Sequence, residues 1–92
     1  NKPAILYYLS ILNGIAYKIG ITNLSVKDRY NNYDLDKITV LKEWEYAVGE
    51  QAYKDEQFYL RIYKEYKYTG KPLLKTGNSE LFTKDILNLD SE

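Results

Sequence analysis

The chain has 92 residues, of which 13 are basic and 13 acidic, so its formal net charge is zero. A chain of this length forms one small domain with one core, and its balanced charge gives no general support for nucleic-acid binding. It contains neither cysteine nor histidine, which excludes the usual zinc sites, thiol nucleophiles and imidazole bases. Any catalysis must therefore use tyrosine, carboxylate, lysine and arginine side chains.

A β-hairpin is predicted near the start of the chain. Two apolar runs, residues 5–12 and 15–21, flank the dipeptide Asn13-Gly14. Asn-Gly between β-rich runs is the strongest short hairpin signal, because a type I′ turn needs positive φ at both central residues. The second strand is predicted to end at Gly20, where the missing Cβ allows close backbone approach or a bend.

After the hairpin, the sequence predicts a short helix and then a third strand. Ser25 can act as the N-cap of a helix of about residues 25–33. Residues 38–46 alternate with a period of two, as expected of a strand, and Ile38 and Val40 are its predicted core-facing residues.

The longest helix is predicted over about residues 50–66, and its apolar stripe includes one carboxylate. The stripe consists of Ala52, Glu56, Tyr59, Leu60 and Tyr63. A carboxylate in that position costs several kcal/mol of folding free energy unless it is paired or bound to a cation. The alternative is that Glu56 lies at the margin of the stripe and its carboxylate reaches solvent.

The C-terminal third contains turn residues at 69–72 and 76–78, and Thr83 can cap a final helical turn. The order ββαβα predicts an α+β fold, with a three-stranded antiparallel sheet flanked by helices and a C-terminal turn or helix. We expect one domain over residues 1–92, and the absence of methionine, even at position 1, suggests a domain excised from a longer protein. No apolar run is long enough to span a membrane and no secretory signal is present, so a cytoplasmic location is expected.

Charge is segregated along the chain. Residues 43–56 carry five acids and one lysine, whereas residues 61–75 carry five bases and one acid. The basic stretch, with Arg61, Lys64 and Lys67, could face the phosphates of DNA. A solvated helix face with i,i+4 ion pairs explains the same pattern equally well.

Several individual residues could carry chemistry, and each has an ordinary structural alternative. Tyrosine supplies 11 of the 14 aromatic residues, so packing is the default role of any one of them. Arg29 could orient a phosphate with its planar guanidinium, or form a weak exposed salt bridge. Lys18 interrupts an apolar strand, either to place its ammonium at a site or to protect a sheet edge.

The hairpin resembles the core of the GIY-YIG nuclease family. Leu6-Tyr7 stands where that family has Ile-Tyr, and Lys18-Ile19-Gly20 stands where it has Tyr-Ile-Gly. Eleven positions separate Tyr7 from Lys18, which is within the usual spacing of the family.

The resemblance extends into the following helix. Arg29 follows the glycine by nine positions, where the family places its helix arginine, and Tyr33 matches a position that is usually His or Tyr. The chain departs from the motif at Ile5, which replaces the first glycine, and at Lys18, which replaces the second tyrosine beside Tyr17.

The resemblance implies a metal-dependent endonuclease that hydrolyses phosphodiester bonds in DNA, similar to phage-encoded enzymes of the homing endonuclease type. By family position, Tyr7 is the first choice for activating water and Tyr17 the second. Lys18 and Arg29 would stabilise the added negative charge, and Glu56 would hold one Mg²⁺ or Mn²⁺ per active site.

Further residues follow from the same resemblance. Tyr33 joins the predicted catalytic residues, and Asn78 and Glu80 lie where the family has a late polar residue near the site. The DNA-binding residues would be Lys18, Arg29 and the basic residues Arg61, Lys64 and Lys67. The family commonly joins such a domain to a separate DNA-recognition region.

Two other classes of function are compatible with the sequence. One is a non-catalytic module that binds DNA or a protein partner on the same fold, which Lys18 and the neutral net charge favour. The other is a tyrosine-rich protein-interaction domain, in which Glu56 would be solvated. The nuclease hypothesis predicts that Tyr7, Lys18, Arg29 and Glu56 converge on one concave surface.

Overall fold

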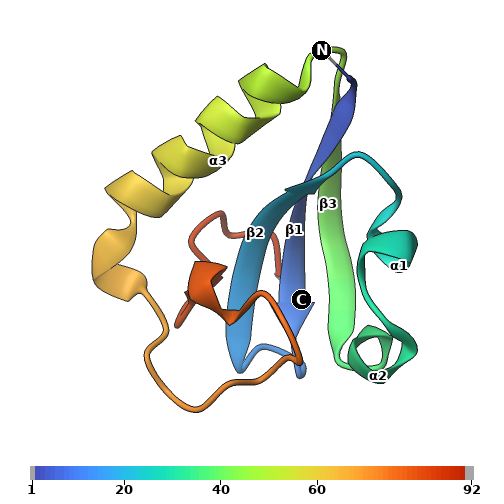
Figure 1. Cartoon of the computed structure of the whole chain (residues 1–92). Helices are drawn as coiled ribbons and strands as arrows, with labels where there is room; N and C mark the ends of the chain where they lie inside the picture. The colour runs from blue at the N-terminus through green and yellow to red at the C-terminus, as the bar shows by residue number, and fades with distance from the viewer. Residues whose placement is uncertain (1, 91–92) are drawn as a thin grey trace.

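The computed structural model describes residues 2–90 and has an α+β architecture (Figure 1). Its strands are β1 (Ala4–Ile11), β2 (Ala16–Thr22), β3 (Ile38–Tyr46) and β4 (Leu81–Phe82). Its helices are α1 (Val26–Arg29), α2 (Asn32–Leu35) and α3 (Gly49–Ile62), with short 3₁₀ turns η1 (Lys64–Tyr66) and η2 (Asn78–Glu80). The predicted α+β class is confirmed.

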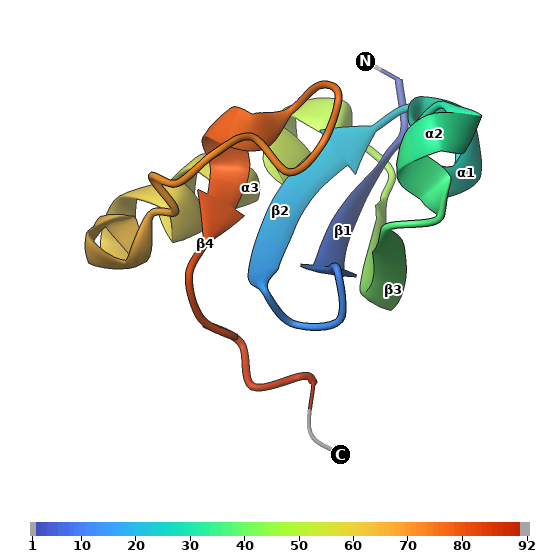
Figure 2. The same cartoon turned by 90° about the horizontal axis from the view of Figure 1, so that it is seen from below.

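The sheet is antiparallel and has four strands in the order β3-β1-β2-β4, rather than the predicted three. The fourth strand pairs with β2 at Tyr17 and Lys18. A strand of two residues is too short to show a period, so the sequence presents it only as the apolar pair Leu81-Phe82. Figure 2 shows this short strand beside β2.

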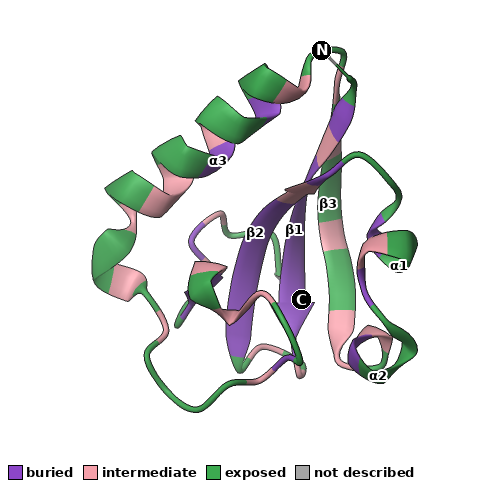
Figure 3. Cartoon of the chain, viewed as in Figure 1, coloured by how far each residue is buried: buried purple, intermediate pink, exposed green. Residues whose placement is uncertain are grey.

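Two core clusters lie on opposite faces of the sheet, because successive residues of a strand point to opposite sides. Tyr7, Leu9 and Ile11 pack with Val26 and Tyr30 on one face. The opposite face packs against the stripe of α3 through residues Leu6, Tyr8, Tyr17, Ile19, Tyr59, Leu60 and Tyr63. Burial therefore runs almost unbroken along β1 and β2 (Figure 3).

The predicted hairpin is confirmed, but its loop has four residues, 12–15, between the paired residues Ile11 and Ala16. Positive φ angles occur at Leu12 (51°), Asn13 (56°) and Gly14 (93°). The backbone N–H of Leu12 donates to the carbonyl of Lys37 over 2.7 Å, which ties the loop to the start of β3. This distant contact accounts for the difference from a two-residue turn.

The single helix predicted over residues 25–33 is instead two one-turn helices. Ser25 caps α1 as expected, since its Oγ accepts from the backbone N–H of Asp28 over 3.1 Å. Tyr30 is then extended, and the Asn31 side chain caps α2 by accepting from the N–H of Asp34 over 3.0 Å. A second N-cap so soon after the first explains the break.

The prediction for Val40 is wrong, because this residue is exposed. The pairing of β3 with β1 shifts at a β-bulge, where Tyr8 lies opposite Lys42 and Leu9 lies opposite Val40. Leu41 is the extra residue and packs against the α3 face. A bulge reverses the inward and outward positions on one side of it, which a simple period of two cannot show.

After Thr83 the described residues form a single hydrogen-bonded turn at Ile86 and Leu87, closed by the N–H of Asn88 donating to the carbonyl of Asp85 over 3.2 Å, and no helix. Asp85 organises this segment instead, because its carboxylate accepts from the hydroxyl of Tyr8 (2.7 Å) and from the backbone N–H groups of Leu89 and Asp90. The long helix ends earlier than predicted, at Ile62, and continues only as the turn η1.

Asp34 fastens α2 to the segment that follows Leu74, and its removal should destabilise the fold. Its carboxylate is fully buried, and both oxygens accept from the backbone N–H of Lys75 over 3.0 Å. Asp34→Ala should lower the free energy of unfolding by about 1.5–3 kcal/mol, the range for hydrogen bonds to a charged group. Urea unfolding measures this change.

The matched control is Asp36→Ala, because Asp36 is exposed on the same short segment. Its substitution should change the free energy of unfolding by no more than about 0.5 kcal/mol. Equal losses at the two positions would contradict the role given to Asp34.

Candidate active site

The side chain of Tyr7 crosses from β1 over β2 at Gly20. These two residues are paired in the sheet. A Cβ added to Gly20 would lie 2.5 Å from the Tyr7 hydroxyl oxygen, which is closer than atoms can approach. Glycine is therefore required here because the phenol ring lies directly over its backbone. The strand does not end at Gly20 as predicted but continues to Thr22.

Tyr7 and Tyr30 form a buried pair of hydroxyl groups. Their oxygen atoms are 3.0 Å apart, and their rings meet edge to face with centroids 6.0 Å apart. Burial raises the pKa of the Tyr7 hydroxyl, while the hydrogen bond with Tyr30 and the charge of Arg29 act in the opposite direction. Burial also raises the pKa of Tyr30.

Tyr30 was not among the residues predicted for the site, although a local signal exists. Val26 and Tyr30 are four positions apart, the spacing of one helix face, and both are buried. Tyr30 also directly follows Arg29, whose guanidinium carbon lies 4.9 Å from the centre of the Tyr30 ring. Val26 and Tyr30 thus stand out in an otherwise polar segment, and this pattern could have identified Tyr30 as the residue that contacts Tyr7.

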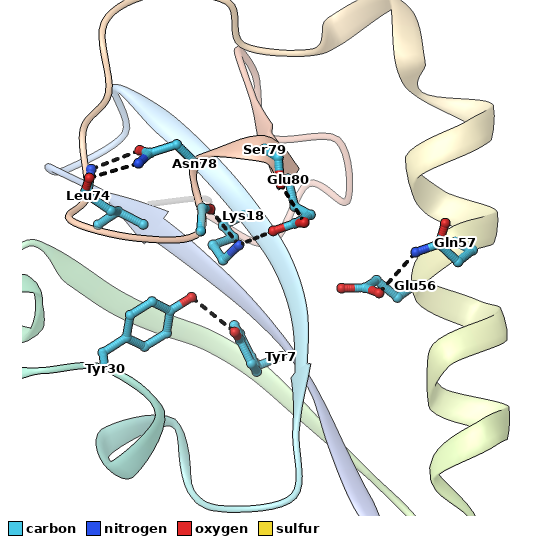
Figure 4. A network of polar contacts seen from close by, with 10 residues as sticks. Tyr7, Lys18, Tyr30, Glu56, Gln57, Leu74, Asn78, Ser79 and Glu80 are labelled. Carbon is cyan, nitrogen blue, oxygen red and sulfur yellow. Dashed lines mark hydrogen bonds and ion pairs between the residues drawn. The ribbon is translucent and has the colours of Figure 1, made fainter.

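Lys18 is buried, with 1% of its surface exposed, and its ammonium is held by the η2 region. Its Nζ donates to the carbonyl of Gly77 and to Oε1 of Glu80, both over 2.7 Å (Figure 4). Burial lowers the pKa of Lys18, and the charge of Glu80 opposes that shift. Burial acts to raise the pKa of Glu80, but hydrogen bonds from Lys18 and Ser79 outweigh burial and lower the pKa.

Arg29 lies beside this ion pair. A Cβ added to Gly77 would be 3.2 Å from Nζ of Lys18 and 3.6 Å from Nη2 of Arg29, so both cations border Gly77. Within residues 2–90, no carboxylate forms an ion pair with Arg29. Its charge acts on Tyr7, Tyr30 and Glu80.

Glu56 approaches the same region from α3. It is 8% exposed, and Nε2 of Gln57 donates to its carboxylate over 3.2 Å. Burial raises the pKa of Glu56, and the charge of Glu80 adds to the rise. Figure 4 shows the Glu56 side chain pointing from α3 toward the Lys18–Glu80 pair, and its charge acts on Tyr7 and Lys18 as well. The prediction of a carboxylate on the buried stripe is confirmed.

These side chains make up what we call the polar cluster: Tyr7, Lys18, Arg29, Tyr30, Glu56 and Glu80. They come from β1, β2, α1, α3 and η2 and from the residue after α1. Lys18 and Arg29 thus meet at Gly77, and the charges of Arg29 and Glu56 act on Tyr7. Within residues 2–90, Glu56 forms no hydrogen bond with the other members of the cluster. Two surface hollows of about 600 and 630 Å³ lie elsewhere, beside Lys2, Ala4 and Asn23, and none of the polar cluster lines them.

Two of the predicted catalytic tyrosines lie away from the polar cluster. Tyr17 belongs to the opposite face of the sheet, where it stacks on Tyr8 and donates to Oδ2 of Asp90 over 2.7 Å. This hydrogen bond raises the pKa of Tyr17 to about 12. Tyr33 is 61% exposed on α2, with Nζ of Lys37 3.9 Å from its ring centre.

Of the two predicted late polar residues, only Glu80 joins the polar cluster. The Asn78 side chain stabilises the preceding loop, since its Oδ1 accepts from the backbone N–H groups of Leu73 and Leu74 over 2.9 Å and its Nδ2 donates to the carbonyl of Leu74 over 2.8 Å. The predicted DNA-binding residues Arg61, Lys64 and Lys67 are exposed at the end of α3 and beyond it.

The donor set of the polar cluster fits a hard divalent cation held by few protein ligands. No group of three or more Asp, Glu, His or Cys side chains suited to a metal occurs among residues 2–90. Both oxygens of Glu80 are hydrogen-bonded, to Lys18 and Ser79, whereas Glu56 accepts only from Gln57 within the described part of the chain. Mg²⁺ is typically bound by one or two carboxylates and keeps several waters, so Glu56 is the candidate ligand.

Comparison with models of known families, with curated proteins and with solved structures found no match. Across residues 2–90, no helix combines the length and the apolar character needed to cross a membrane.

The buried carboxylate of Glu56 should destabilise the fold at neutral pH. Because burial raises its pKa above the value in the unfolded chain, the folded state disfavours the ionised form, and stability falls as pH rises from the unfolded pKa through the folded one. Glu56→Gln should therefore raise the melting temperature at pH 7. The difference from the unmodified chain should vanish below about pH 4, where Glu56 is neutral in both states.

Melting curves from pH 3.5 to 8 in the absence of divalent cations measure this effect. Glu50→Gln is the matched control, because Glu50 is exposed in the first turn of the same helix. A lower melting temperature for Glu56→Gln at pH 7 would instead mark Glu56 as a structural hydrogen-bond partner.

Proposed function

We propose that this chain is a nuclease domain of the GIY-YIG type, which hydrolyses phosphodiester bonds in DNA with one Mg²⁺ or Mn²⁺. The observation that carries the proposal is that Lys18 and Arg29 meet at Gly77 while the charges of Arg29 and Glu56 act on Tyr7, although the four residues belong to four separate elements. Their grouping combines a proton acceptor, two cations and a buried carboxylate, which are the groups that phosphodiester hydrolysis requires in a chain without histidine.

In the proposed reaction, Tyr7 takes a proton from the attacking water. The charge of Arg29 acts to lower the pKa of Tyr7, and Tyr30 can donate a hydrogen bond to the ionised Tyr7 oxygen across 3.0 Å. Both effects favour the ionised phenol that burial otherwise disfavours. Tyr30 is therefore part of the proposed proton-accepting group.

Arg29 binds the scissile phosphate, because its planar guanidinium carries five N–H donors in a fixed fork and forms no ion pair with a carboxylate among the described residues. Lys18 contributes its positive charge without contacting the phosphate, because Gly77 and Glu80 hold its ammonium in place. Added negative charge at phosphorus is thus stabilised by one direct contact and one nearby buried cation.

Glu56 would hold the divalent cation, which when bound supplies Lewis-acid stabilisation of the leaving oxygen. The family resemblance also implies a phage-type enzyme acting on intracellular DNA, with a separate recognition region selecting the site.

A non-catalytic DNA-binding module is the second candidate, and one observation favours it. Tyr7 and Lys18 are each 1% exposed, and the Lys18 ammonium already has two short contacts, so neither side chain is open to water or to a phosphate. Such a module would bind DNA through Arg29 and leave it uncut.

Nicking of supercoiled plasmid separates the two candidates. The nuclease proposal predicts conversion to open-circle or linear DNA with Mg²⁺ or Mn²⁺ and no conversion with EDTA. Glu56→Gln should abolish the conversion, and the exposed control Glu50→Gln should retain it. Binding of plasmid without any nicking by the unmodified chain would favour the non-catalytic module.

Replacing Tyr7 by Phe tests the proton acceptor. The substitution keeps the ring over Gly20 and should cost about 1–3 kcal/mol of stability, because the buried Tyr30 hydroxyl loses the hydrogen bond with Tyr7. The single-turnover rate at saturating Mg²⁺ should fall by about two orders of magnitude or more, as for loss of a general base.

The control for this measurement is Tyr59→Phe, because Tyr59 packs on the α3 stripe against the opposite face of the sheet. Its cleavage rate should stay near that of the unmodified chain. Equal losses at the two positions, or no loss at Tyr7, would remove Tyr7 from the mechanism.

A further inference from the structure

An exposed tyrosine on α2 lies between two lysines. Tyr33 exposes 61% of its surface. Nζ of Lys37 lies 3.9 Å from the centre of its ring, and Nζ of Lys75 lies 5.2 Å from it. We call these three residues the Tyr33 platform. An accessible ring beside two cations is the combination that binds single-stranded nucleic acid, because bases stack on the ring and phosphates are attracted to the cations.

The Tyr33 platform is attached to the buried side chain of Asp34. The buried Asp34 carboxylate accepts from the backbone N–H of Lys75 through both oxygens and lies 3.8 Å from Nζ of Lys37. Lys37 also donates to the carbonyl of Leu73 over 3.3 Å. α2 and the loop that carries Lys75 therefore form one preorganised unit, which lowers the entropy cost of binding a ligand.

This unit adjoins the polar cluster. Lys75 precedes Gly77 by two residues, so their Cα atoms are at most about 7 Å apart. Gly77 is the residue that Lys18 and Arg29 border.

We propose that the Tyr33 platform binds an unpaired nucleotide of a DNA strand, with its base stacked on Tyr33 and its flanking phosphates on Lys37 and Lys75. This inference rests on the proposed function for the identity of the ligand, and it gives Tyr33 a role in binding rather than catalysis. A paired base cannot offer its face to an exposed ring, so the platform selects single-stranded over double-stranded DNA. Binding moves the two ammonium groups from the ring to the phosphates. For Lys37 this breaks its contacts with Leu73 and Asp34, whereas the backbone attachment of Lys75 to Asp34 is kept.

Fluorescence anisotropy with a labelled 12-nucleotide oligodeoxythymidine tests the proposal in EDTA, where no cleavage occurs. Tyr33→Ala should weaken binding about 5- to 100-fold, the effect of losing one base–aromatic stack. Tyr33→Phe should bind as the unmodified chain does, because the ring is kept. Tyr53→Ala is the matched control, since Tyr53 is 53% exposed on α3, and it should leave the affinity unchanged.

The two lysines are tested by salt dependence. Lys37→Gln and Lys75→Gln should each reduce the slope of log affinity against log salt concentration by about 0.7, as for loss of one phosphate contact with a single strand. A duplex of the same length should bind with no dependence on Tyr33.

The proposal is overturned if Tyr33→Ala binds the oligonucleotide as tightly as the unmodified chain, or if Tyr33→Phe loses as much affinity as Tyr33→Ala. These outcomes are independent of catalysis. Binding that depends on Tyr33 without plasmid nicking would reject the nuclease and keep the platform. Nicking with no such dependence would reject the platform and keep the nuclease.

Discussion

The buried ammonium of Lys18 joins the C-terminal third of the chain to the sheet. Lys18 lies on β2, and its ammonium donates to the Gly77 carbonyl and the Glu80 carboxylate. Lys18 is also paired in the sheet with Leu81, the residue that follows Glu80. Breaking a buried ion pair leaves an uncompensated charge, which is far more costly than an exposed pair is worth. The position of η2 and of β4 therefore depends on a lysine in the middle of an apolar strand.

Asp34 makes a second attachment of the same kind. It binds the backbone of Lys75 two residues before Gly77, so the segment from 73 to 80 is fastened at both ends by charged side chains that are buried or nearly so. A segment with few apolar residues is in this way held in one place without a large core of its own. The polar cluster and the Tyr33 platform lie along this segment, which accounts for their closeness.

Side chains alternate between the two faces of a strand, so the candidate site residues of β1 and β2 lie on one face of the sheet and Tyr17 lies on the other. Tyr7 lies opposite Gly20, and Lys18 shares the face of Gly20 because residues two apart in a strand point the same way. Tyr17 must then face the other side, where it stacks on Tyr8. This division follows from the sequence once the hairpin register is known, and it excludes Tyr17 as an alternative to Tyr7 on geometric grounds.

Sequence patterns correctly predicted the features that depend on nearby residues. These are the hairpin, the Ser25 cap and the buried stripe that carries Glu56. Sequence patterns could not predict β4, whose two residues show no period, or the bulge at Leu41, which depends on pairing with β1. Glu80 was a possible site residue by resemblance alone, because its partner is 62 positions away in the chain. Contacts at that separation are set by tertiary packing, which no periodicity records.

The two carboxylates of the polar cluster differ in a way that bears on the proposed reaction. Glu80 is paired with Lys18 and its pKa is lowered, whereas Glu56 has only an uncharged donor, Gln57, and its pKa is raised by burial and by the charge of Glu80. Adding a divalent cation beside Glu56 would remove this unfavourable charge–charge interaction and keep the Lys18–Glu80 pair intact. Glu80 thus stabilises the fold through Lys18, and Glu56 is the carboxylate that remains available for a cation.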